Sequence, residues 1–216
     1  MPLYKTITVT PTIRVHIWKI EEAEDELAKD IVLTPHCQHR IDGMKSELHR
    51  RGFLSIRHLL AVEGYTDSDL YYDALGKPHL KDGNFISITH SYTFTGIIVS
   101  ENEEVGIDIE KQREKILKIA HKFTPVEEYN SVKGPEELAR KLTVVWGGKE
   151  SLYKISSIPG LSFLKHIDIK DFILDKGSTT GTISYEGAVT AFKIKFLEME
   201  GFTCAYARKE ATNSVN

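Results

Sequence analysis

The sequence predicts an α+β fold, because amphipathic helical segments and segments of alternating hydrophobicity occur in both halves of the chain. Alternation over residues 3–20, interrupted by Pro11, predicts two strands near the start of the chain. The longest helical pattern begins after Gly134-Pro135 and covers about residues 136–155. In the last third, alternation predicts antiparallel hairpins, with strands around residues 167–173, 182–185, 189–196 and 202–207.

Turn and capping residues predict the elements between these segments. Thr34-Pro35 indicates the start of a helix, and apolar residues follow at helical spacing from Ile41 to Leu59. Thr124-Pro125-Val126-Glu127 is typical of a capping box that opens a helix, and this structural role alone accounts for Glu127. Further strands are expected at residues 85–89, 95–100 and 105–110. A seam near residues 100–105 predicts two lobes, residues 1–103 and 104–216.

Composition restricts the class of protein. The chain has 216 residues, of which 41% are hydrophobic and 27% charged, as in an ordinary globular protein. Its net charge of −3 argues against a dedicated nucleic-acid binder. Cys37 and Cys204 are too few cysteines for a secreted disulfide scaffold, and no apolar run is long enough to span a bilayer. Because the start also lacks the apolar region of a signal peptide, we expect a cytoplasmic protein with no membrane contact.

The segment Gly106-Ile107-Asp108-Ile109-Glu110 carries the clearest chemical signal. In a strand, Asp108 and Glu110 point to the same face with Cα atoms about 6.6 Å apart. Two carboxylates about 5 Å apart repel by about 3 kcal/mol at an effective dielectric constant of about 20, so a partly buried pair favours a cation between them. Hard oxygen ligands of this kind suit Mg²⁺. The alternative is a solvated strand face, where water screens most of the repulsion.

A second signal lies in the expected helix, in the segment 146–154. Trp146, Glu150 and Lys154 are each four residues apart and therefore form one stripe. On a surface, the Glu150–Lys154 pair would contribute only about 0.2–0.5 kcal/mol. However, Gly147-Gly148 inside a helix costs about 1 kcal/mol per glycine relative to alanine, which indicates close approach to the backbone or a bend.

Weaker signals lie in the first half. Ser87-Ile88-Thr89-His90-Ser91 offers hydroxyls around a histidine, which suits a phosphate site or a Ser/His pair, although no Gly-x-Ser-x-Gly elbow is present. Gly76-Lys77-Pro78 is by itself typical of a turn with a solvated lysine. Arg50 and Arg57 are seven residues apart on one helix face and could clamp a phosphate, or could simply be solvated. The spacing in His36-Cys37-Gln38-His39 matches no standard zinc site.

The order of these motifs resembles the 4′-phosphopantetheinyl transferases. Gly-Lys-Pro, Ser-x-Thr-His-Ser, Gly-Ile-Asp-Ile-Glu and Trp-x-x-Lys-Glu-Ser-x-x-Lys follow one another, and the last two are the family's signatures. The length is similar to that of the larger, surfactin-synthetase-activating subtype. This resemblance implies a monomer made of two similar α/β lobes related by a pseudo-twofold axis.

The resemblance also implies roles for individual residues. Asp108, Glu110 and Glu150 would hold Mg²⁺ against the pyrophosphate of coenzyme A, and Lys154 would neutralise charge at the leaving oxygen. The remaining phosphate contacts would come from the first half: Lys77, Thr89 and His90, with Arg57 and either Arg50 or Arg51 on the 3′-phosphate. The chain departs from the family pattern at Gly147-Gly148, where bulkier residues are common, and at Thr89, where serine is usual.

The implied reaction transfers phosphopantetheine from coenzyme A to a serine of an apo acyl or peptidyl carrier protein and releases adenosine 3′,5′-bisphosphate. Glu150 or a metal-bound water would act as the base. Carriers are typically acidic, and basic residues directly after the metal strand offer a docking surface: Lys111, Arg113, Lys115 and Lys118, with Ile116 and Leu117. The alternatives are a non-catalytic coenzyme A or nucleotide-binding module and a Mg²⁺-dependent phosphoesterase.

Overall fold

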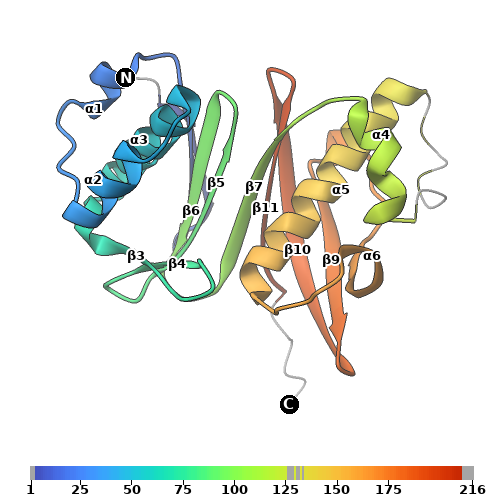
Figure 1. Ribbon diagram of the computed structural model, residues 1–216. Helices are drawn as coiled ribbons and strands as arrows, with labels where there is room; N and C mark the ends of the chain where they lie inside the picture. The colour runs from blue at the N-terminus through green and yellow to red at the C-terminus, as the bar shows by residue number, and fades with distance from the viewer. Residues whose placement is uncertain (1–2, 126–128, 130–131, 133, 211–216) are drawn as a thin grey trace. The chain divides into compact units, whose positions relative to one another are not determined.

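The computed structural model describes residues 3–125, 129, 132 and 134–210. The chain forms two compact units, Met1–Asn102 and Glu103–Asn216, each with its own sheet and helices (Figure 1). This mixed α/β architecture is the one that the sequence pattern predicts. No helix among the described residues is long and apolar enough to cross a membrane.

The first unit contains a four-stranded antiparallel sheet in the order β1-β2-β6-β5. The strands are β1 (Leu3–Thr10), β2 (Ile13–Lys19), β5 (Phe85–Ser91) and β6 (Phe94–Ser100). Helix α3 (Glu47–Val62) packs against β6 and β2, and its residues Leu59 and Leu60 are fully buried. The two strands expected over residues 3–20 are therefore confirmed, with the break at the expected place.

Smaller elements complete the first unit: α1 (Glu24–Ala28), α2 (Pro35–Asp42), the 3₁₀ helix η1 (Asp67–Asp69), and the hairpin of β3 (Leu70–Tyr72) and β4 (Pro78–Leu80). The predicted start of α2 is confirmed, because the Thr34 hydroxyl accepts a hydrogen bond from the Cys37 backbone N–H. The helical spacing from Ile41 to Leu59 is divided between two helices. Gly43 caps the end of α2, and the Ser46 hydroxyl caps the start of α3.

The second unit contains a five-stranded antiparallel sheet in the order β7-β11-β10-β9-β8. Its strands are β7 (Val105–Lys111), β8 (Ile167–Ile169), β9 (Ser178–Tyr185), β10 (Ala188–Met199) and β11 (Phe202–Lys209). The predicted antiparallel hairpins are confirmed, although the strand expected over residues 167–173 ends at Ile169. The alternation in β10 buries Phe192, Ile194 and Phe196 while Lys193 and Lys195 stay exposed.

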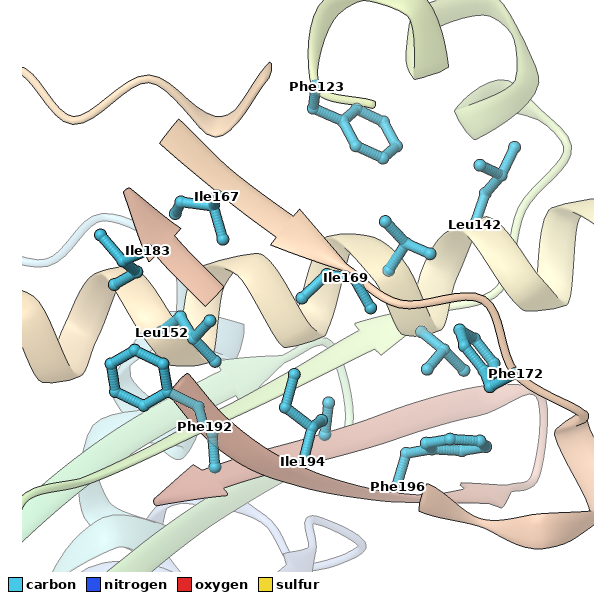
Figure 2. Close-up of a cluster of buried hydrophobic side chains, with 14 of the residues drawn as sticks. Phe123, Leu142, Leu152, Ile167, Ile169, Phe172, Ile183, Phe192, Ile194 and Phe196 are labelled. Carbon is cyan, nitrogen blue, oxygen red and sulfur yellow. The ribbon is translucent and has the colours of Figure 1, made fainter. Parts of the chain in front are cut away.

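Helix α5 (Pro135–Ser156) lies along one face of this sheet, mainly over β7 and β11 (Figure 1). It begins as predicted, with Pro135 at the first helical position and Glu136 and Glu137 in the first turn, where acidic side chains favour the helix dipole. Its apolar residues meet those of the sheet in one core, in which Leu142 and Leu152 face Ile169, Phe192 and Ile194 (Figure 2). Packing against the sheet thus fixes the position of α5 along β7 and β11.

Shorter helical elements line the other side of α5: α4 (Lys115–Ile119), η2 (Ala120–Lys122) and α6 (Phe163–His166), with η4 (Leu174–Lys176) before β9. Phe123, just after η2, enters the same core (Figure 2). The capping box expected at Thr124-Pro125-Val126-Glu127 extends into residues 126–128, which lie outside the described part of the chain.

Candidate active site

Strand β7 carries two acidic side chains on the face that α5 covers. In the pairing with β11, Asp108 is opposite Ala205 and Glu110 is opposite Thr203. Asp108 is buried, whereas Glu110 is partly exposed. Ile107 and Ile109 are buried on the opposite face, as strand alternation requires. Asp108 is therefore not part of a solvated strand face, since only 6% of the residue is exposed.

Close contact between α5 and the sheet explains the two glycines inside the helix. A Cβ atom on Gly147 would lie 3.2 Å from Cβ of Ala205 and 3.6 Å from Oδ2 of Asp108. A Cβ atom on Gly148 would lie 3.4 Å from Cδ1 of Ile169. The expectation that something approaches the backbone at Gly147-Gly148 is confirmed, and this approach brings the face of α5 that carries Glu150 close to the acidic residues of β7.

Lys154 joins the helix to the strand. Its ammonium group donates to Oδ1 of Asp108 at 2.9 Å and to the backbone carbonyl of Ile107 at 2.8 Å. The lysine therefore pairs with a buried carboxylate on β7, and does not form the simple surface pair with Glu150 that the helical spacing also allowed. The ammonium group therefore offsets the charge of Asp108, while Glu110 and Glu150 add further acidic groups nearby.

Three carboxylates influence one another here. Burial raises the pKa of Glu150 to about 7; the Asp108 and Glu110 charges contribute to the rise, and Lys154 opposes it. Burial also raises the pKa of Glu110 above its usual value, with a further contribution from Asp108, while a hydrogen bond from Trp146 and the charges of Arg113 and Lys154 act in the opposite direction. Negative charge is thus concentrated in a partly dehydrated place, which favours a bound cation.

The three carboxylates of this site offer ligands that suit a hard divalent cation, although they are not already arranged around one point. Among the described residues, no group of three or more His, Cys, Asp or Glu side chains is arranged as metal ligands. Asp108, Glu110 and Glu150 nevertheless supply carboxylate oxygens, the ligands that Mg²⁺ prefers. Within the described part of the chain, Glu150 accepts no hydrogen bond although it is half-buried. Its carboxylate oxygens are therefore available to a ligand such as a cation.

Sequence reasoning missed the role of Lys149. Its ammonium group is buried and donates to three backbone carbonyls, those of Phe123, Phe163 and Ile167, at 2.6, 2.8 and 2.6 Å. The lysine therefore fastens α5 to three other segments of the second unit. A signal was present in the sequence, because Lys149 lies four residues after Val145 and three before Leu152, on the apolar face of the helix.

The candidate phosphate contacts of the first unit are not all brought together. Thr89 and His90 are neighbours on β5, so their side chains point to opposite faces of the sheet. Thr89 is buried, whereas His90 is exposed and its ring meets that of His49 edge-on, with centroids 6.1 Å apart. Lys77 is partly exposed beside the β3–β4 hairpin, where its backbone N–H donates to Asp73.

Arg50 and Arg57 do not converge as their spacing suggested. Arg50 pairs with Glu24 at 2.7 Å and donates to the carbonyl of Met44. Arg57 is buried, pairs with Asp67 at 2.8 Å and also donates to the Phe53 carbonyl. Each guanidinium is directed to a different carboxylate, so a shared phosphate clamp would require both ion pairs to open.

Comparison with known families adds evidence that the geometry alone does not give. A family model described as the 4′-phosphopantetheinyl transferase superfamily matches residues 104–211, which is half of the chain. The chain belongs to this superfamily. No curated protein sequence matches it closely enough to serve as a named relative.

The match covers the second unit and includes all four charged residues of the site, Asp108, Glu110, Glu150 and Lys154. The protein is thus a transferase of the phosphopantetheinyl transferase superfamily, in which coenzyme A is a substrate and a divalent metal is typical. The matched segment does not include Lys77, Thr89, His90, Arg50 or Arg57, so the superfamily match carries no assignment for these residues.

Proposed function

We propose that this protein transfers the 4′-phosphopantetheine group of coenzyme A to a serine of an apo acyl or peptidyl carrier protein, in a Mg²⁺-dependent reaction that releases adenosine 3′,5′-bisphosphate. One observation carries the proposal: within the segment that the superfamily model matches, β7 and α5 supply three interacting carboxylates with Lys154 between strand and helix. A protein that only bound coenzyme A would not need this whole set.

The metal would be held by Asp108, Glu110 and Glu150 in this proposal. When bound, Mg²⁺ orients the pyrophosphate and stabilises negative charge on its oxygens. The energetic argument is that burial, together with repulsion between the carboxylates, raises the pKa values of Glu110 and Glu150, and a bound cation would stabilise their ionised forms. Because Lys154 already lies on Asp108, the ammonium group would move toward the phosphates as they bind.

The chemical step is an in-line displacement at phosphorus. The serine oxygen of the carrier forms a bond to the β-phosphorus of coenzyme A, the bond to the bridging oxygen breaks, and adenosine 3′,5′-bisphosphate leaves. Lys154 would neutralise the charge that develops on the leaving oxygen. We assign the serine proton to Glu150, because Lys154 holds Asp108 while Glu150 is half-buried and accepts no hydrogen bond from the described residues.

The first unit would bind the rest of coenzyme A. His90 and Lys77 are the better candidates for its phosphates, because both side chains reach the surface of that unit. Thr89 would contribute from the opposite face of β5, and Arg50 and Arg57 only after exchange of their carboxylate partners for a phosphate. We further propose the larger, two-lobed type of transferase, acting as a monomer in the cytoplasm, where Cys37 and Cys204 would remain the free thiols that they are here.

The carrier would dock on basic side chains that follow β7. Lys111, Arg113, Lys115 and Lys118 are exposed, whereas Ile116 and Leu117 pack partly against the core of the second unit. The recognition we propose is therefore mainly electrostatic, toward an acidic carrier. Charge reversal at Lys115 and Lys118 should raise the KM for the carrier and leave the KM for coenzyme A unchanged; an unchanged carrier KM would remove this surface from the proposal.

The test of the function is the intact mass of a purified apo acyl carrier protein after incubation with the protein, coenzyme A and Mg²⁺. We expect a gain equal to one phosphopantetheine group. The gain should disappear with EDTA and with the Glu110→Gln variant. A matched control is Asp168→Asn, which removes an exposed carboxylate from β8 of the same sheet and should leave the gain intact.

Other outcomes distinguish the rival functions. Tight binding of coenzyme A with no mass gain on several carriers would indicate a binding module without transfer activity. Release of phosphate from simple esters, dependent on Glu110 and Mg²⁺, would indicate a phosphoesterase. In both cases the proposed transfer reaction would be wrong.

A further inference from the structure

An open groove in the second unit is lined by four lysines. It lies where β9 and β10 meet the segment of residues 170–176 that follows β8, and its volume is about 720 Å³ (β9 and β10 are labelled in Figure 1). Lys193 and Lys195 come from β10, and Lys170 and Lys176 come from the segment after β8. All four residues are exposed, so the groove concentrates positive charge on a chain whose net charge is −3.

Carboxylates of the chain do little to offset this charge. Among the described residues, Asp171 is the one acidic residue that lines the groove, and it pairs with Lys141, a buried residue of α5 outside the lining. Lys193 pairs with Glu210 at 3.6 Å, but both side chains are about half-exposed, and such surface pairs contribute little. Within the described part of the chain, the other three lysines of the groove have no carboxylate partner. An acidic partner would therefore complement the groove.

The groove also lies at the edge of the sheet. β8 pairs with β9 only over residues 181–183, and one further backbone hydrogen bond joins the Lys170 N–H to the Thr180 carbonyl at 2.9 Å. Directly opposite the two β10 lysines, the first residues of β9 present the exposed hydroxyl side chains of Ser178 and Thr180. Sheet edges of this kind accept an extended peptide, and hydroxyl groups next to lysines add hydrogen-bond donors for carboxylates.

The lining favours a peptide over a nucleic acid. Proteins bind single-stranded nucleic acids largely through exposed aromatic rings on which the bases stack. The aromatic residue of the described lining, Phe172, is instead buried, and its ring packs on that of Phe196 with centroids 5.0 Å apart. Ile173, by contrast, is 60% exposed at the groove and offers an apolar contact for a peptide side chain.

We propose that this groove binds an extended acidic peptide segment of a partner protein, with carboxylate side chains on the four lysines and an apolar side chain on Ile173. The lining includes neither the charged residues of the candidate active site nor the basic residues that follow β7. The inference therefore goes beyond the proposed transfer reaction and does not depend on it.

The test uses a fluorescein-labelled peptide of alternating glutamate and valine, whose glutamates share one face when the chain is extended. Binding to the full chain would be followed by fluorescence anisotropy. The double variant Lys193→Glu/Lys195→Glu should bind the peptide at least about 10-fold more weakly than the wild type, because attraction at two positions becomes repulsion. Added salt should weaken binding to the wild type, since exposed charges are screened.

The second unit offers a matched control. Lys122→Glu/Lys165→Glu makes the same change in net charge at exposed positions of η2 and α6, outside the groove, and should bind within about twofold of the wild type. No binding of the peptide to the wild type, or equal binding to the groove variant and the wild type, would overturn the inference. Either result would leave the proposed transfer reaction standing.

Two further arms test the site and the class of partner. Lys170→Glu/Lys176→Glu changes the groove from the segment after β8 without altering β10, and it should weaken binding to a similar extent; unchanged affinity would overturn the groove as the binding site. A labelled oligothymidylate of the same charge as the peptide should bind at least about 10-fold more weakly than the peptide. Equal affinity for the oligonucleotide, lost in the same variants, would overturn the peptide assignment in favour of a nucleic acid.

Discussion

Gly106 of β7 lies directly under the backbone of Ser151 in α5, so closely that a Cβ atom on Gly106 would be 2.0 Å from the Ser151 carbonyl oxygen. Ser151 is the residue after Glu150, and Gly106 lies two residues before Asp108. The Ser151 hydroxyl also donates to the Ala205 carbonyl of β11 at 3.1 Å. Helix and strand therefore touch through their backbones at the point where each presents an acidic side chain.

The first prediction concerns this contact. Gly106→Ala should destabilise the second unit by about 3 kcal/mol or more, because a clash with backbone cannot be relieved by a change of side-chain rotamer. Urea unfolding followed by Trp146 emission in a Trp18→Phe background measures this. Gly43→Ala is the control, since its Cβ would meet backbone oxygens at an ordinary 3.6 Å, and it should change stability by less than about 0.5 kcal/mol. Equal effects of the two substitutions would contradict the contact.

Much of the second unit could be predicted from its sequence because local pattern and packing agree there. The alternation of Phe192, Ile194 and Phe196 with lysines determined which face of β10 is buried. Asp108 and Glu110 share a face for the same reason, and Gly147-Gly148 indicated the close approach. Such features can be read from sequence because burial of one face of a strand or helix selects apolar residues at the repeat of that element.

Other parts depended on partners distant in sequence. Seven-residue spacing placed Arg50 and Arg57 on one helix face, but Glu24 and Asp67, which come from other segments, determine where each guanidinium points. In the same way, spacing placed Lys154 beside Glu150, whereas the ammonium pairs with Asp108. Spacing along one helix predicts only the side of the helix from which a side chain projects. The ion pair that the side chain forms depends on which opposite charge lies on that side.

A second prediction concerns Lys149. Lys149→Met keeps the length of the side chain but leaves three backbone carbonyls without their ammonium donor, those of Phe123, Phe163 and Ile167. A buried carbonyl that loses its donor costs about 1–3 kcal/mol, so we expect the second unit to lose about 3 kcal/mol or more. Lys165→Met, at an exposed position of α6, should change stability by less than about 0.5 kcal/mol. A loss below 1 kcal/mol for Lys149→Met would be inconsistent with three hydrogen bonds.

A third prediction separates stability from activity at Glu150. Burial and the nearby Asp108 charge disfavour its ionised form, so Glu150→Gln should raise the Tm of the metal-free protein at pH 8. The same variant should transfer phosphopantetheine at least about 100-fold more slowly, because the acceptor of the serine proton is lost. Calorimetry in EDTA and the carrier mass assay measure the two effects. Glu186→Gln, in the exposed β9–β10 turn, should change neither; a lower Tm for Glu150→Gln would refute the argument from repulsion.

A last prediction concerns acid stability of the first unit, where Glu63 at the end of α3 meets Arg14 and His16 of β2. Burial opposes ionisation of Glu63, but hydrogen bonds from Arg14, at 2.8–3.0 Å, and from His16 outweigh it, and its pKa lies below the ordinary 4.5. The folded protein holds the Glu63 carboxyl proton less tightly than the unfolded chain does. The contribution of ionised Glu63 to stability is therefore complete above about pH 4.5 and declines as the pH falls through the lower folded pKa.

Glu63→Gln should therefore be less stable than the wild type at pH 7, and the difference should shrink below pH 4. Urea unfolding at pH 7 and pH 3 in a Trp146→Phe background, followed by Trp18 emission, measures this, and Glu21→Gln on the surface should show no such trend. A difference that stays constant from pH 7 to pH 3 would mean that ionised Glu63 does not stabilise the fold.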